Sequence, residues 1–136
     1  MTPSSPVQRF NSGLVVPAQA PFPEGARVGD LLFLSGQLGN VPGRMELVPG
    51  GLAAETRQTL QNIRTVLQGQ GLDLHHLLRC TVMLADMQDW PEFNLIYREF
   101  FGAHPLPARS AFGCLGLALG ARVEIECVAA AGLVPG

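Results

Sequence analysis

The spacing of apolar and polar residues changes several times along the chain and predicts alternating strands and helices. Residues 30 to 37 (DLLFLSGQ) form a short apolar run ending in Ser-Gly, which is typical of a buried strand entering a turn. Residues 77 to 85 and 121 to 130 alternate between apolar and polar positions, which predicts strands with two different faces. Further strands are expected at residues 7 to 10 and 108 to 115.

Two segments have helical spacing instead. Residues 52 to 70 repeat apolar side chains at Leu60, Ile63 and Leu67, and Gly71 supplies a natural C-terminal stop. The second helix follows Asp89, because Asp-Trp-Pro-Glu resembles a capping box with proline in the first turn. Its apolar stripe, expected to lie on a sheet, consists of Phe93, Ile96, Tyr97, Phe100 and Phe101.

The order of these elements is strands, helix, strand, helix and two strands, which predicts an α+β fold. Two helices can cover one face of a sheet of this size. We expect one domain over residues 1 to 136, with residues 1 to 20 as an extended, proline-rich N-terminal arm. The other sheet face carries apolar residues such as Met83 and Val128, which favours a homo-oligomer and a site at a subunit boundary.

Composition narrows the possible partners and cofactors. The chain of 136 residues is 47% hydrophobic, has a net charge of -2 and contains no lysine, and its nine arginines are scattered singly, so a nucleic-acid partner is disfavoured. Neither a signal peptide nor a membrane-spanning run is recognisable, so we expect a cytoplasmic protein without a membrane partner. The three cysteines and three histidines lack metal-ligand spacing, so neither a metal nor another cofactor is expected.

Two charged residues in predicted strands are candidates for the chemistry of a site, and the first lies in a stretch of small and apolar residues. Arg109, in LPARSAFG, is either a solvated arginine or a planar clamp for a small carboxylate. Glu124 is either an outward-facing strand residue or a base whose pKa is raised in a pocket. Glu126 lies on the same strand face two residues later, so the two glutamates could also act as a catalytic carboxylate pair of the kind found in glycosidases, and this alternative stays open.

Three further positions are candidates for ligand contacts. Ser35 and Gly36 form either an ordinary turn or a backbone that approaches a ligand closely. Asn94 lies beside the centre of the apolar stripe of the second helix. It is either a solvated residue or a polar contact to a ligand or partner chain.

Taken together, the segments resemble the RidA (YjgF) family of reactive intermediate deaminases, also labelled endoribonuclease L-PSP. The resemblance covers residues 21 to 132 and depends on GDLLFLSGQLG, ETRQTLQNIRTVL, CTVMLADMQDW, FNLIYREFF, LPARSAFG and ARVEIECVAA, in family order and with similar spacing. It implies a chorismate-mutase-like fold, with two helices backing a mixed sheet. It also implies a homotrimer around a central barrel, with ligand clefts between subunits.

The resemblance also implies roles for individual residues. Arg109 would bind the substrate carboxylate and Glu124 would position or activate water. Ser35 and Gly36 would line the site, together with Asn94.

Two positions depart from the family pattern. Phe22 replaces a usual tyrosine, which removes one hydroxyl from the site. Ala111 replaces a frequent cysteine, and the family tolerates alanine there.

The implied activity is the cofactor-independent hydrolysis of 2-imino and 2-enamino acids, such as 2-aminoacrylate and 2-iminopropanoate, to 2-keto acids and ammonia. Two alternatives stay open at this point. One is a non-catalytic trimer that binds or senses a small carboxylate such as a keto acid. The other is a weak endoribonuclease or translation inhibitor, which the absence of lysine disfavours.

Overall fold

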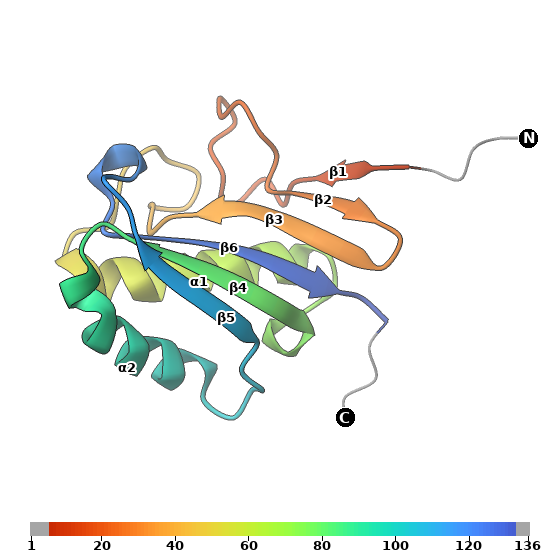
Figure 1. Cartoon of the computed structure of the whole chain (residues 1–136). Coiled ribbons are helices and arrows are strands. Elements are labelled where there is room, and N and C mark those ends of the chain that lie inside the picture. Colours follow the sequence, from red (N-terminus) through yellow and green to blue (C-terminus); the bar gives the residue numbers. More distant parts are fainter. Residues whose placement is uncertain (1–5, 133–136) are drawn as a thin grey trace, which may run out of the picture.

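The computed structural model describes residues 6–132, and its centre is one mixed sheet of six strands (Figure 1). Their order across the sheet is β1-β2-β3-β6-β4-β5. β4 and β5 are parallel, and the other neighbouring pairs are antiparallel, which confirms the mixed sheet. The strands are β1 (Gln8–Phe10), β2 (Gly25–Val28), β3 (Leu31–Gln37), β4 (Leu77–Leu84), β5 (Ala108–Gly113) and β6 (Val123–Ala130).

Two helices, α1 (Gly51–Gly69) and α2 (Trp90–Phe101), pack on the same face of this sheet (Figure 1), which confirms the predicted layers. Three single-turn 3-10 helices connect the elements: η1 (Leu74–His76), η2 (Met87–Asp89) and η3 (Ala118–Gly120). The core lies between the helices and the sheet, because the apolar stripes of both helices meet the inward positions of β3, β4 and β6. Within residues 6–132, neither long helix combines the length and hydropathy needed to cross a bilayer.

Two local features differ from the sequence-based expectations. β2 was not foreseen, because its four residues, GARV, show no apolar run or sustained alternation. The capping box expected at Asp89 is wrong, because the Asp89 side chain makes no cap hydrogen bond. Its carboxylate instead accepts hydrogen bonds from the Arg122 guanidinium at 2.8 and 2.9 Å, while Asp86 caps the preceding turn by accepting from the Gln88 backbone N–H at 2.9 Å.

The segment before β2 is organised by one buried carboxylate. Glu24 is fully buried and accepts hydrogen bonds from the Ser12 N–H at 2.6 Å, the Ser12 hydroxyl at 3.0 Å, and the N–H groups of Val15 and Val16 at 3.2 and 3.1 Å. These bonds hold residues 12 to 16 in a loop, with the Val15 side chain buried in the core. Residues 1–5 of the expected arm lie outside the described residues.

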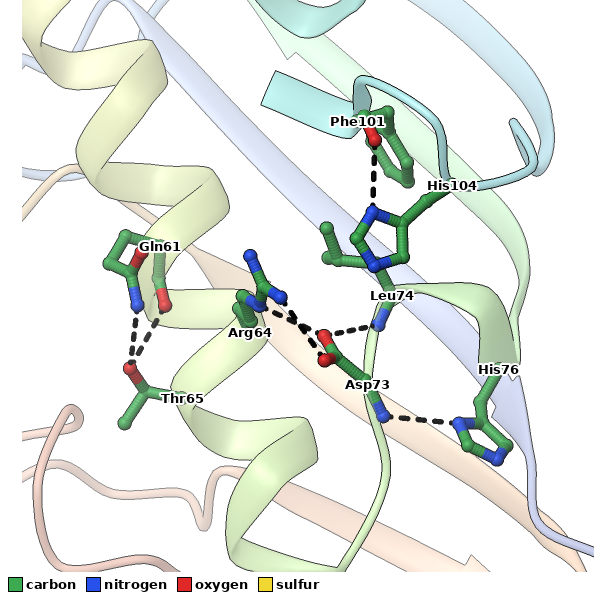
Figure 2. Close-up of polar contacts among 8 residues, drawn as sticks. All are labelled: Gln61, Arg64, Thr65, Asp73, Leu74, His76, Phe101 and His104. Carbon is green, nitrogen blue, oxygen red and sulfur yellow. Dashed lines mark hydrogen bonds and ion pairs between the residues drawn. The ribbon is translucent and has the colours of Figure 1, made fainter.

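A polar network joins the end of α1 to η1 (Figure 2). Arg64 pairs with Asp73, with Nε 2.9 Å from Oδ1, and Asp73 also accepts from the Leu74 N–H at 2.7 Å. Burial alone would raise the pKa of Asp73, but the hydrogen bonds from Arg64 and Leu74 outweigh it and lower that pKa. His76 Nδ1 accepts from the Asp73 backbone N–H, so this histidine has a structural role.

Candidate active site

Arg109 lies on the edge strand β5 and points toward α2. It is paired in register with Cys80 of β4, whose side chain is buried on the helix-covered face. The partly buried Arg109 guanidinium donates a hydrogen bond to Asn94 Oδ1 at 2.7 Å. Its Cζ atom lies 4.9 Å from the centre of the Tyr97 ring and 5.5 Å from that of Phe93. The guanidinium is therefore held over aromatic rings, with Asn94 fixing its orientation.

The positive charge of Arg109 has no carboxylate partner among residues 6–132. The side chain borders a cleft of about 340 Å³, which Trp90, Asn94, Leu106 and Pro107 help to line. A guanidinium has five N–H donors in a planar fork, and Asn94 accepts from one of its nitrogens. The donors that Asn94 does not engage can grip the two oxygens of a small carboxylate.

Ser35 and Gly36 lie in an irregular part of β3. Leu34 pairs with Cys127 and Gln37 pairs with Ile125, so two residues of β3 face a single residue of β6. This is a β-bulge, a feature that re-aims backbone and side chains and is frequent beside active sites. The Ser35 hydroxyl donates to the Pro23 carbonyl at 2.8 Å, which ties the bulge to the segment before β2.

The Glu124 side chain lies directly against the α-carbon of Gly36. A Cβ atom at position 36 would overlap the Oε2 atom of Glu124, so only glycine leaves room for the carboxylate there. Burial raises the pKa of Glu124, and the neighbouring charge of Glu126 raises it further. A carboxylate with a raised pKa is suited to accept a proton from water.

Within one chain, however, Arg109 and Glu124 lie on opposite faces of the sheet. Arg109 aligns with Cys80, which faces the helices, whereas Glu124 aligns with Met83, three residues along the same strand. Because successive side chains of a strand alternate, residues three apart point to opposite faces. The glutamate therefore projects from the face that the helices leave open, and one chain does not bring the two charges together.

The remaining candidates separate into the same two groups. Ala111 lies two residues after Arg109 on the same face and packs against the core. Phe22 is 47% exposed and shares a cavity with Gly36. We call Arg109, Asn94 and Ala111 the arginine half-site, and Phe22, Ser35, Gly36 and Glu124 the glutamate half-site.

Two neighbours of the glutamate half-site were missed in the sequence. Glu24 gives no signal there, because a lone carboxylate between proline and glycine belongs to no periodic element. Leu119 falls in a short segment without secondary-structure signals, and its unusual backbone is visible only in the structure. Among residues 6–132, no group of histidine, cysteine, aspartate and glutamate side chains could hold a metal ion.

Known proteins resemble this chain in both sequence and structure. Residues 14–131 match the family described as Endoribonuclease L-PSP. The Mus musculus protein named 2-iminobutanoate/2-iminopropanoate deaminase is 38% identical over 130 residues, which cover 95% of this chain and 96% of the mouse protein. Two E. coli structures superimpose closely. TdcF with bound serine has a TM-score of 0.83 at 26% identity, covering 90% of this chain and 98% of TdcF. The YjgF gene product has a TM-score of 0.84 at 28% identity, covering 91% and 98%.

Proposed function

Because this chain belongs to the RidA (YjgF) family, the one described as endoribonuclease L-PSP, we propose that it is a cofactor-independent deaminase. Its substrates are 2-imino and 2-enamino acids, which it hydrolyses to 2-keto acids and ammonia. The observation that carries the proposal is Arg109, a partly buried guanidinium without a carboxylate partner in the described residues, aimed by Asn94 into a cleft. The name of the mouse relative supports the same reaction.

In the proposed mechanism, Arg109 binds the substrate carboxylate and Glu124 activates water. The water oxygen bonds to the C=N carbon while Glu124 takes a water proton, and the π electrons of the C=N bond move to nitrogen, which receives that proton from Glu124. In the resulting carbinolamine, Glu124 takes the hydroxyl proton and passes it to the amino nitrogen. The C–N bond then breaks, ammonia leaves, and the electrons of the former O–H bond form the C=O bond of the keto acid. The reaction needs positioning and one proton shuttle, which the two half-sites supply when they meet.

The two half-sites meet, we propose, between chains of a homotrimer with the chorismate-mutase-like arrangement. The face that carries Glu124 is the uncovered one, and it also exposes Phe33 and Phe112. An apolar sheet face of this kind favours a neighbouring subunit. In this assembly, Arg109 of one chain faces Glu124 of the partner subunit.

The reaction is tested by generating 2-aminoacrylate from serine with a dehydratase in the presence of semicarbazide, which traps the imine. The wild-type protein is expected to suppress the trapped product and speed pyruvate release. Arg109→Ala is expected to lower kcat/KM by about a hundredfold or more, because a charged hydrogen-bond pair is lost. Arg57→Ala, which removes an exposed arginine of α1, is the matched control and should keep full activity.

The composite site is tested by mixing Arg109→Ala chains with Glu124→Gln chains. Each mixed trimer regains one intact site if the half-sites come from different chains. Random mixing in equal amounts should then restore about a quarter of wild-type activity from two inactive variants. No recovery in verified mixed trimers contradicts the composite site. Keto-acid binding without any turnover by the wild type would favour the binding-protein alternative.

A further inference from the structure

Two cysteines face each other inside the core, on neighbouring strands. Cys80 of β4 and Cys127 of β6 are paired in register, and their Sγ atoms lie 3.2 Å apart. The two strands are antiparallel, and directly opposed residues of such strands have Cα atoms about 4.5–5.5 Å apart. A disulfide requires Cα atoms about 4.4–6.8 Å apart, so the backbone already meets this requirement. Both thiols are nevertheless free.

Neither thiol takes part in the proposed imine hydrolysis, in which Arg109 and Glu124 act. A free cysteine is often only a small apolar residue of a core, and the burial of Cys80 and Cys127 fits that role. Packing alone does not explain why the two thiols contact each other, since any small apolar side chain would fill either position. The contact between the two sulfur atoms therefore calls for a chemical explanation.

The two thiols differ in the way that an attacking and a resolving thiol differ. The hydrogen bond with Cys127 lowers the pKa of Cys80 more than burial raises it, and the positive charge of Arg109 lowers it further. The same hydrogen bond, together with burial, raises the pKa of Cys127. Cys80 is aligned with Arg109 on its other side, because β4 lies between β6 and β5 (Figure 1). Cys80 therefore forms the thiolate more readily and is the sulfur that an oxidant attacks first.

We propose that Cys80 and Cys127 are a reversible oxidation site, at which hydrogen peroxide closes an intrachain disulfide between β4 and β6. The Cys80 thiolate attacks a peroxide oxygen and the O–O bond breaks, which leaves a sulfenic acid and a hydroxide that is protonated to water. The Cys127 thiolate then attacks that sulfur, the S–O bond breaks, and the departing hydroxide is also protonated to water. In total, two thiols lose two electrons and two protons, and one peroxide becomes two waters. This proposal does not depend on the proposed deaminase function.

The disulfide stabilises the folded chain. It joins residues 47 positions apart, around a segment that contains α2 and β5. Closing a loop of this length restricts the unfolded chain, so the folded state becomes relatively more stable. Because both thiols are buried, the oxidant reaches them only when the core opens locally, and the bond forms slowly in the folded protein.

Disulfide mapping tests which cysteines pair. The reduced chain is refolded in glutathione buffers of increasing oxidised fraction, free thiols are alkylated, and linked peptides are measured by mass spectrometry. The half-buried Cys114 provides an internal comparison, because its loop to Cys127 is much shorter and closes more readily in an unfolded chain. We expect the Cys80–Cys127 bond to dominate in the folded protein, whereas in urea the Cys114–Cys127 bond should exceed it by about fivefold.

Peroxide treatment and thermal melts test the effect of the bond in the native protein. After hours in hydrogen peroxide, Cys114→Ser should lose about 2 Da per chain, and its Tm should rise by about 5 °C or more. Dithiothreitol should reverse both changes. The double variant that adds Cys127→Ala lacks the resolving thiol and is the matched control, which should show neither change. Absence of the Cys80–Cys127 bond in either experiment, dominance of a Cys114 pairing in the folded protein, or a Tm that does not rise on linkage would overturn the proposal.

Discussion

Gly36 offers a way to displace the Glu124 carboxylate without removing it. In Gly36→Ala, the added methyl group would coincide with the Oε2 atom of Glu124 and lie 3.0 Å from its Cδ and 3.3 Å from its Cγ. Because these atoms belong to the far end of a flexible side chain, the glutamate can rotate away, at about 0.5–1.5 kcal/mol for an unfavourable rotamer. Gly36 does not have a positive φ, so alanine also gains about 0.4–1 kcal/mol by restricting the unfolded chain.

The two contributions to stability nearly cancel, so the thermal midpoint of Gly36→Ala should change little. Activity should fall even though stability is kept, because a general base contributes its rate enhancement of about 10²–10⁴-fold only when it is held within reach of the reacting water. We expect kcat/KM for imine hydrolysis to fall by about a hundredfold, measured by the semicarbazide assay beside thermal melts. Gly116→Ala is the matched control, since a methyl group at that glycine meets nothing within 4 Å.

A double-variant cycle makes the test specific to Glu124. In the Glu124→Gln background, Gly36→Ala should cause little further loss, because the group that it displaces no longer acts as a base. Full activity of Gly36→Ala would refute the role of this close contact. Independent, multiplicative losses from the two substitutions would show that Gly36 acts through something other than Glu124.

Three other expectations follow from single side chains. Burial, and to a smaller extent the charge of Glu126, raises the pKa of Glu124 in the folded state. The contribution of Glu124 to folding stability is therefore present in acid and is lost as pH rises through that pKa. Glu124→Gln should therefore raise Tm at neutral pH and leave Tm unchanged at pH values below the ordinary pKa of glutamate, as measured by thermal melts across pH. In the wild type, kcat/KM should fall in acid, because protonation removes the base. Glu24→Gln exchanges an acceptor of four hydrogen bonds for an amide and should cost about 1–3 kcal/mol in urea unfolding, and a loss near zero would contradict the loop-anchoring role. Phe22→Tyr adds a hydroxyl group at the cavity that Phe22 shares with Gly36, and one new hydrogen bond to the ligand should raise kcat/KM by up to about tenfold. An unchanged or lower kcat/KM would show that no ligand group lies within reach of this hydroxyl.

The elements with strong periodicity were predictable from the sequence. The apolar stripe of α2 is buried at Phe93, Ile96, Tyr97 and Phe101, because spacing by three and four residues places these side chains on the face toward the sheet. The alternation in β6 likewise placed Val123, Ile125 and Cys127 in the core. Short elements such as β2 were not predictable, since four residues make a strand only through their neighbours.

The candidate site was predictable as a set of residues but not as an arrangement. The sequence identified Arg109, Asn94, Gly36 and Glu124, and the structure brings them together only as two pairs. The bulge at Ser35 and Gly36 depends on the pairing of β3 with β6, which no local pattern reveals. The strained backbone of Leu119 depends on the turn around it and gave no signal either.

The separation of the two pairs follows from strand geometry and constrains how such a site can work. Side chains alternate along a strand, and the register fixes Arg109 on the helix-covered face and Glu124 on the open face. No rotamer change carries a carboxylate through a hydrogen-bonded sheet, so a single chain cannot place both charges on one small substrate. If both groups act in the proposed reaction, the second must come from another copy, and activity then depends on assembly. A chain that folds correctly but stays alone would keep both half-sites and lack the reaction, which is why the mixing experiment is more decisive than either single substitution.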